Sequence, residues 1–122
     1  MRLRGSCHCG ATRFEVTEVP QTLTRCTCSI CTKRGTLWAY YTPEQFSLLT
    51  PTENSAPNRR RTEAIRLNSC PKCGCGAFTE MPNWVDGEPD FDHPRIAVNA
   101  RLFDAFDIDR VPVTVIDGKS LW

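Results

Sequence analysis

The sequence predicts a mainly β, loop-rich single domain over residues 1–122, with little helix and with cysteine-bound metal helping to hold it together. Three observations support this prediction. The apolar residues alternate with polar ones over short segments, no long amphipathic helical pattern is present, and eight cysteines gather in three tight clusters. A chain of 122 residues can bury only a modest core, so a bound metal ion would add useful stability.

The first half of the chain contains two predicted strands and one helical turn. In "ATRFEVTEVP" (residues 11–20), Phe14 and Val16 alternate with charged residues, and a proline ends the segment. "TLWAYYT" (residues 36–42) is rich in aromatic residues and is also typical of a strand. In "TPEQF" (residues 42–46), Thr42 as a cap and Pro43 in the first position predict one helical turn.

The second half alternates between turns and short strands. Residues 50–62, "TPTENSAPNRRRT", are expected to form a surface loop, and residues 63–70 a short strand that leads into the last cysteine cluster. Residues 81–95 have the composition of turns. "RIAVNARLF" (residues 95–103) alternates again, with Ile96 and Val98 expected on one side. Residues 104–118 are expected to end the chain in short strands and turns.

Charge and composition argue against several classes of protein. A formal net charge of +1 and a sequence pI near 7.5 predict no general attraction to nucleic acid or to an anionic membrane. No apolar run approaches the roughly 20 residues of a membrane-spanning helix. The start, "MRLRGSCHCG", has no apolar stretch of the signal-peptide type, so we expect a cytoplasmic protein.

The cysteines form the clusters Cys7-x-Cys9, "CTCSIC" (residues 26–31) and "CPKCGC" (residues 70–75). Disulfides within such short loops would stabilise little, whereas neighbouring thiolates can converge on one ion, so zinc is favoured. A zinc-dependent nucleobase deaminase is excluded, because no Cys or His is followed two residues later by Glu.

Two groupings of the cysteines are open on spacing alone. In a zinc ribbon, Cys28 and Cys31 would join Cys70 and Cys73, which leaves four cysteines unused. In the second grouping, Cys7 and Cys9 reach one ion from an extended segment and join Cys70 and Cys73 in a closed site. This second arrangement leaves Cys26, Cys28 and Cys31 to hold another ion with a vacant fourth position, the pattern of catalytic zinc.

Four segments, "GSCHCGATRFEV", "CTCSICTKRGTLWA", "CPKCGCGAF" and the tail from Ile96 to Trp122, carry a resemblance that spans nearly the whole chain. In these segments the chain resembles the glutathione-dependent formaldehyde-activating enzymes, a family that includes centromere protein V and shares the Mss4-like fold. The resemblance implies several coiled, mostly antiparallel sheets held by zinc. The chain differs from the family pattern at Asn68 and Ser69, just before the third cysteine cluster. Cys75 is an additional thiol whose role the sequence leaves open.

The resemblance also implies the second grouping and two zinc ions per chain. It makes Cys7, Cys9, Cys70 and Cys73 (the four-cysteine group) ligands of a structural zinc, and Cys26, Cys28 and Cys31 (the cysteine trio) ligands of a catalytic zinc. The implied activity is that of a carbon–sulfur lyase of the S-(hydroxymethyl)glutathione synthase type, which condenses formaldehyde or a related aldehyde with glutathione or another thiol. The alternative is a non-catalytic Mss4-like zinc module that binds protein.

Several polar residues are candidates for supporting roles, although each has a simpler interpretation. Lys33 and Arg34 could balance the negative charge of the cysteine trio, or could be ordinary surface charges. The arginines of "NRRRTEAIR" could bind the carboxylates of glutathione, or could simply be solvated: Arg59, Arg60, Arg61 and Arg66. Trp38, Tyr40 and Tyr41 could line a pocket or belong to the core. His8 is expected to point away from the first cysteine pair, and His93 to be exposed.

Overall fold

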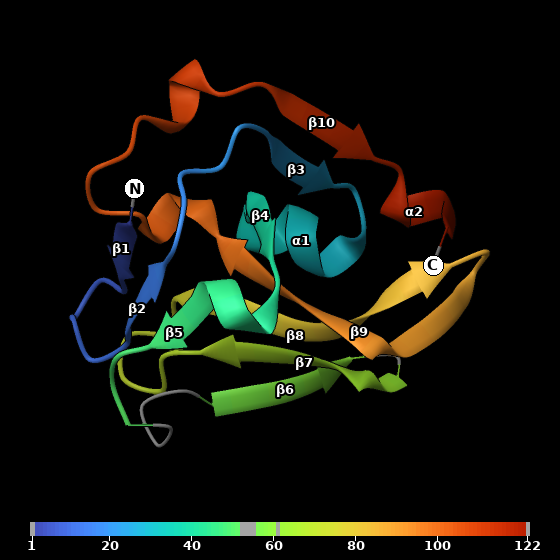
Figure 1. Cartoon of the computed structure of the whole chain (residues 1–122), viewed down its shortest axis with the longest axis horizontal. Helices are drawn as coiled ribbons and strands as arrows, with labels where there is room; N and C mark the ends of the chain where they lie inside the picture. Colours follow the sequence, from blue (N-terminus) through green and yellow to red (C-terminus); the bar gives the residue numbers. More distant parts are fainter. Residues whose placement is uncertain (1, 52–55, 61, 122) are drawn as a thin grey trace.

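The fold consists of two β-sheets with short helical turns between their strands (Figure 1). The computed structural model describes residues 2–51, 56–60 and 62–121. The strands are β1 (Leu3–Ser6), β2 (Arg13–Val16), β3 (Leu23–Cys26), β4 (Trp38–Tyr41), β5 (Phe46–Leu48), β6 (Ala56–Arg60), β7 (Thr62–Ser69), β8 (Gly76–Val85), β9 (Glu88–Asn99) and β10 (Val113–Ile116). The helical segments are α1 (Ser29–Arg34), η1 (Pro43–Gln45), η3 (Ala100–Leu102), η4 (Ile108–Arg110) and α2 (Gly118–Leu121). The predicted mainly β class with little helix is confirmed.

The smaller sheet has the strand order β1-β2-β5, and the larger sheet has the order β10-β3-β4-β9-β8-β7-β6. Among the described strands, every pairing is antiparallel except that of β10 with β3. No helix within the described ranges is long and apolar enough to cross a membrane.

Alternation along β4 and β9 gives the larger sheet two buried faces. Ala39 and Tyr41 on β4, with Ile96 and Val98 on β9, face the main hydrophobic core, as the sequence predicts for Ile96 and Val98. The residues between them face a second cluster, formed with the cysteine trio by Trp38, Leu67 and Ala97, against which Tyr40 packs. The sheet therefore separates the main core from the trio.

Aromatic side chains join the two sheets. Phe14 on β2 is fully buried and stacks on Phe46 of β5, with ring centroids 5.8 Å apart. Phe46 in turn meets Phe78 of β8 at 4.8 Å, and Phe103 packs edge-on against Phe14. Such ring pairs contribute about 0.5–1.5 kcal/mol each beyond the area they bury. The alternation predicted for residues 13–16 is confirmed by this packing.

The predicted helical turn at residues 42–46 is also confirmed. Thr42 caps η1, and the side chain of Gln45 accepts a 2.9 Å hydrogen bond from the backbone N–H of Thr42. Pro43 occupies the first position, where a missing N–H costs nothing.

The expectation that residues 81–95 are mostly turns is wrong. They form a long hairpin of β8 and β9 in which Val85 pairs with Glu88, so only Asp86 and Gly87 make the turn. Both residues have positive φ, 52° and 80°, as a tight two-residue hairpin loop requires. Pro82 is accommodated where the register shifts between Met81 and Asn83.

The expectation of a surface loop over residues 50–62 is wrong for residues 56–60, which form the edge strand β6 paired with β7. An edge strand tolerates Pro57 because the backbone N–H groups on its outer side have no neighbouring strand to which they could donate. Residues 52–55 and 61 lie outside the described residues. The strand expected over residues 63–70 is confirmed as part of β7.

Candidate metal centres

The cysteine trio lies at the corner where β3 meets α1. Cys26 is the last residue of β3, Cys28 is the N-cap of α1, and Cys31 lies in its first turn. The helix ends at Gly35, which adopts the left-handed conformation with φ 66°. This helix was not predicted, although Lys33 and Arg34 in the last turn followed by glycine are a recognised helix-end pattern. The corner brings three separate backbone positions to one point.

All three sulfur atoms of the trio lie within 4.8 Å of one another. The three side chains are at most 9% exposed, covered by Trp38, Leu67 and Ala97. Burial raises the pKa of the Cys26 thiol, and raises that of Cys31 to about 12 even though the indole of Trp38 opposes the shift. A divalent cation would reverse this balance, because it supplies the positive charge that three clustered thiolates need.

Two N–H groups point at the sulfur atoms of the trio. The indole Nε1–H of Trp38 donates to Cys31 Sγ at 3.3 Å, and the backbone N–H of Cys28 donates to Cys26 Sγ at 3.5 Å. Such donors orient a ligand sulfur and favour its thiolate form. Trp38 therefore contributes to the site as well as to packing, a role that the sequence left open.

The C-terminal segment closes one side of the trio. β10 runs parallel to β3, and α2 follows β10 in the chain (Figure 1). Asp117 accepts a 3.1 Å hydrogen bond from the hydroxyl of Thr27, which in turn accepts one from the N–H of Lys119. Gly118 then packs so closely that a Cβ placed on it would overlap Cys26 Sγ and lie 3.1 Å from Cys28 Cβ. No local sequence pattern indicates this contact, because Thr27 and Asp117 are 90 residues apart in the chain.

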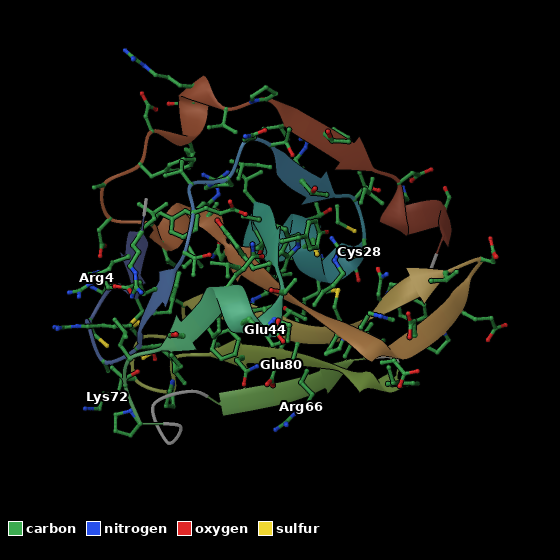
Figure 2. The ribbon with its side chains drawn as sticks, viewed as in Figure 1. Arg4, Cys28, Glu44, Arg66, Lys72 and Glu80 are labelled. Carbon is green, nitrogen blue, oxygen red and sulfur yellow. The ribbon has the colours of Figure 1, made fainter. Side chains whose placement is uncertain are left out.

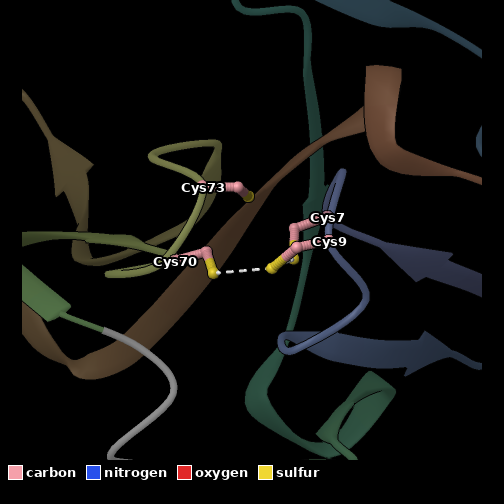
Figure 3. Close-up of side chains that lie close together, drawn as sticks. All are labelled: Cys7, Cys9, Cys70 and Cys73. Atoms are coloured by element: carbon pink, nitrogen blue, oxygen red, sulfur yellow. Dashed lines mark hydrogen bonds between the residues drawn. The ribbon is translucent and has the colours of Figure 1, made fainter.

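The four-cysteine group lies where the loop after β1 meets the loop between β7 and β8 (Figure 3). Cys7 Sγ and Cys9 Sγ are 3.7 Å apart, and Cys9 Sγ is 3.6 Å from Cys70 Sγ. The expectation that Cys7 and Cys9 converge from an extended segment is wrong. They lie in a turn, closed by the N–H of Gly10 donating to the carbonyl of Cys7 at 3.1 Å.

The loop from Cys70 to Cys75 is shaped to hold thiolates. The N–H of Gly74 donates to the carbonyl of Cys70 at 2.8 Å, and Gly74 adopts φ 81°, which a residue with a side chain rarely does. Backbone N–H groups of Cys75 and Cys9 donate to Cys73 Sγ and lower its pKa to about 5. N–H groups of Cys73 and Lys72 lower the pKa of Cys70.

Cys9 behaves differently from Cys70 and Cys73. The N–H of Ala11 opposes the shift, but loss of solvent and the neighbouring thiols of Cys70, Cys7 and Cys73 raise the pKa of Cys9 to about 11. The pKa of Cys9 and those of Cys70 and Cys73 are therefore shifted in opposite directions, and a bound divalent cation would favour the thiolate form of each of them. Four converging sulfur donors with N–H groups aimed at them fit a thiophilic divalent ion.

Both groups could thus hold a metal ion, and the structure assembles the second of the two groupings that the sequence allows. Cys28 and Cys31 lie with Cys26, and Cys70 and Cys73 lie with Cys7 and Cys9, so the zinc-ribbon grouping is not the one formed. Cys75 belongs to neither group. Its sulfur accepts the N–H of His8, and its carbonyl accepts the N–H of Cys70 at 2.9 Å.

Most of the supporting residues suggested by the sequence lie elsewhere. Arg66 faces Glu80 across β7 and β8 at 3.9 Å (Figure 2). Arg61 and the side chains of Arg59 and Arg60 lie outside the described part of the chain. Lys33 and Arg34 are exposed on α1. His8 is exposed, and His93 is exposed as expected, with its Nδ1 2.7 Å from Asp90.

One arginine was not suggested by the sequence. Arg95 lies with its guanidinium 4.1 Å over the ring of Tyr40, beside the cluster that contains the trio. It stands at the boundary between the residues expected to form turns (81–95) and the alternating segment 95–103, and alternation alone does not show that its side chain lies over Tyr40.

Comparison with known proteins gives a consistent result. The sequence pattern of the family described as glutathione-dependent formaldehyde-activating enzyme matches residues 2–105. A Halomonas elongata protein, provisionally named glutathione-dependent formaldehyde-activating enzyme, is 59% identical over 134 aligned positions, which cover 100% of this chain and 80% of that protein. The crystal structure of a Rhodobacter sphaeroides protein superposes with a TM-score of 0.70 over 92% of this chain and 100% of its own, at 23% identity, and so shares the fold.

Proposed function

Because the chain belongs to the family of glutathione-dependent formaldehyde-activating enzymes, we propose that it is a carbon–sulfur lyase of the S-(hydroxymethyl)glutathione synthase type. Its substrates are formaldehyde, or a related aldehyde, and glutathione or another thiol. The sulfur attacks the carbonyl carbon, a carbon–sulfur bond forms as the carbonyl π bond opens, and the thiol proton ends on the new hydroxyl oxygen. No oxidant or reductant is needed.

The observation that carries this proposal is the unequal size of the two sulfur groups. The four-cysteine group offers four sulfur donors, the number that a closed zinc site needs, and is assigned a structural zinc. The cysteine trio has three donors and is assigned the catalytic zinc, which gives two zinc ions per chain. Zinc bound by three protein ligands supplies an exchangeable fourth position and lowers the pKa of a thiol there.

The residues around the trio have three roles in this reaction. Trp38 and the backbone N–H of Cys28 orient the sulfur atoms of Cys31 and Cys26. Leu67 and Ala97 exclude water from the sulfur atoms, which strengthens the electrostatic interactions there. Gly118 has no side chain that would overlap the sulfur of Cys26. Because the addition is chemically easy, positioning of the two reactants supplies most of the acceleration.

Exchange NMR of formaldehyde with glutathione tests the proposal. We expect the wild-type protein to accelerate the approach to equilibrium, and Cys28→Ser to lose the acceleration. Cys75→Ser is the matched control, because its sulfur lies outside the trio and interacts instead with Cys73 of the four-cysteine group; this variant should keep the acceleration. If the wild-type protein leaves the exchange rate unchanged, the lyase assignment is wrong and a non-catalytic zinc module that binds protein is the better account.

A further inference from the structure

A cleft with a volume of about 450 Å³ opens at the end of β4. Its lining includes an arginine, a histidine, two carboxylates and two tyrosines, namely Arg95, His93, Glu44, Asp92, Tyr40 and Tyr41. Tyr40 belongs to both places, because it lines the cleft and packs against the cluster formed by the trio. The ring of Tyr40 therefore connects the lining of the cleft to the cluster that contains the trio.

Strand geometry puts Arg95 on the trio's face of the larger sheet. Ala97 pairs with Tyr40 across β9 and β4 and is fully buried against the trio. Arg95 lies two residues before Ala97 on the same strand. Its side chain therefore projects from the same face as that of Ala97, about 7 Å away along β9.

The guanidinium of Arg95 is held in place without a carboxylate partner among the described residues. It lies 4.1 Å from the centroid of the Tyr40 ring, a cation–π contact that fixes the plane of the group. Tyr40 also packs against the cluster that contains Cys26 and Cys31. By contrast, Arg66 is engaged by Glu80, and Arg2 and Arg4 by Glu15. Arg95 is thus an oriented, half-buried cation facing a cleft.

The charges in the cleft suit an amino-acid-like zwitterion. A guanidinium can bind a carboxylate through two parallel hydrogen bonds, and Glu44 and Asp92 offer acceptors for an ammonium group. Glutathione carries two carboxylates and one ammonium group on the two residues that flank its cysteine. A simple aldehyde carries none of these groups, so the cleft is matched to the thiol and not to formaldehyde.

We propose that Arg95 binds a carboxylate of the thiol cosubstrate in this cleft and so directs its sulfur to Cys26, Cys28 and Cys31. The inference rests on the proposed function, which it deepens by naming a residue that selects acidic thiols. Arg95 is a binding and specificity residue, and the reacting atoms remain at the trio.

Binding and turnover, measured separately, test the inference. Calorimetry with S-methylglutathione reports binding without reaction, because the sulfur is blocked. Turnover is followed by exchange NMR with glutathione and with its diethyl ester, which lacks both carboxylates. The variants are Arg95→Gln and Arg95→Lys. Arg110→Gln is the matched control, because it removes the same charge at an exposed position outside the cleft.

We expect Arg95→Gln to weaken binding of S-methylglutathione, and to raise KM for glutathione, about 10- to 100-fold with little change in kcat. Arg95→Lys should recover part of the loss, and Arg110→Gln should match wild type. With the diethyl ester, wild type and Arg95→Gln should perform equally, since the partner of Arg95 is absent. Unchanged thermal melting of Arg95→Gln would exclude a folding defect as the cause.

The possible failures are distinguishable. Turnover of glutathione with the same KM in wild type and Arg95→Gln overturns the role of Arg95 and leaves the proposed function intact. If S-methylglutathione binds in a way that depends on Arg95 but the protein does not accelerate the exchange, the binding role of Arg95 is supported and the lyase assignment is overturned. Absence of both binding and acceleration in the wild type overturns both.

Discussion

Trp38 links the packing around the cysteine trio to the chemistry proposed there. Its ring is 8% exposed, and its only polar hydrogen points at Cys31 Sγ from 3.3 Å. An indole N–H that donates to sulfur fixes the orientation of that sulfur and stabilises its negative charge. The same contact satisfies a donor that would otherwise be buried without a partner.

Trp38→Phe tests this role, because phenylalanine keeps an aromatic ring and removes the donor. We expect zinc affinity at the trio to fall about 10- to 100-fold, as is typical when a partner of a metal ligand is lost. The free energy of unfolding should fall by only about 1–2 kcal/mol, for the smaller ring.

Competition with a chromogenic chelator measures the affinity, and thermal melting measures the stability. Trp84→Phe is the control, because Trp84 is 43% exposed near the tip of the β8–β9 hairpin and should change neither quantity much. Equal chelator curves for Trp38→Phe and wild type would show that the indole donor does not support the metal.

At the scale of elements, the C-terminal segment is an integral wall of the trio. β10 extends the larger sheet beside β3, and the hydrogen bonds of Thr27 with Asp117 and Lys119 fix the segment. Gly118 is buried and touches the trio directly. The family pattern matches only residues 2–105, so this wall lies outside the matched region.

Gly118→Ala should disturb the trio and spare the four-cysteine group. The added Cβ would displace Cys26 Sγ, so we expect about 10- to 100-fold weaker zinc binding at the trio and a parallel loss of activity. Lys119→Ala is the neighbouring control, because its exposed side chain can be removed without changing the backbone bond to Thr27. Wild-type zinc binding and activity in Gly118→Ala would contradict the close packing at this point.

The elements that could be predicted from the sequence were those with local signals. Alternation identified β2 and the end of β9, aromatic composition identified β4, and capping residues identified η1. The long hairpin was missed because three prolines and several acidic residues obscured its alternation, although Asp86-Gly87 is a strong hairpin signal. The edge strand β6 was missed because its pairing with β7 is not encoded in its own composition.

The sequence predicted the local parts of the candidate site, but not the parts that depend on long-range contacts. Short cysteine spacings identified the clusters, since ligands close in sequence must also be close in space. Spacing alone did not decide which clusters join, because that depends on how β1 meets the β7–β8 loop. Gly118 lies against the trio, and Arg95 lies over Tyr40 beside the trio's cluster, only because of long-range strand pairing, so no local pattern could identify them.

At the scale of the whole molecule, the two sulfur groups connect different parts of the fold. The four-cysteine group joins the smaller sheet, through the loop after β1, to the larger sheet at the β7–β8 loop. The trio is confined to the corner of β3 and α1, which hydrogen bonds and sheet pairing also hold. Loss of metal should therefore have unequal consequences at the two groups.

Cys70→Ser and Cys28→Ser compare those consequences. A structural zinc can contribute about 10 kcal/mol or more to folding, which is comparable with the whole stability of a small domain, so Cys70→Ser should leave the chain largely unfolded at 37 °C. Cys28→Ser should keep the fold and lose more than about 100-fold in activity. Circular dichroism with thermal melting measures the fold of both variants, and exchange NMR measures the activity of Cys28→Ser. Equal destabilisation by the two changes would contradict the division of roles.

The most direct test of the account is a chelator titration. Native mass spectrometry counts the zinc ions that each folded chain holds at every step, and so tests whether the two sites have different roles. We predict two zinc ions per chain at the start. One should leave at low chelator concentration while the protein remains folded, and the second only at high concentration together with unfolding. A chain that holds one zinc throughout, or that loses two ions in a single step with its fold, would contradict the account.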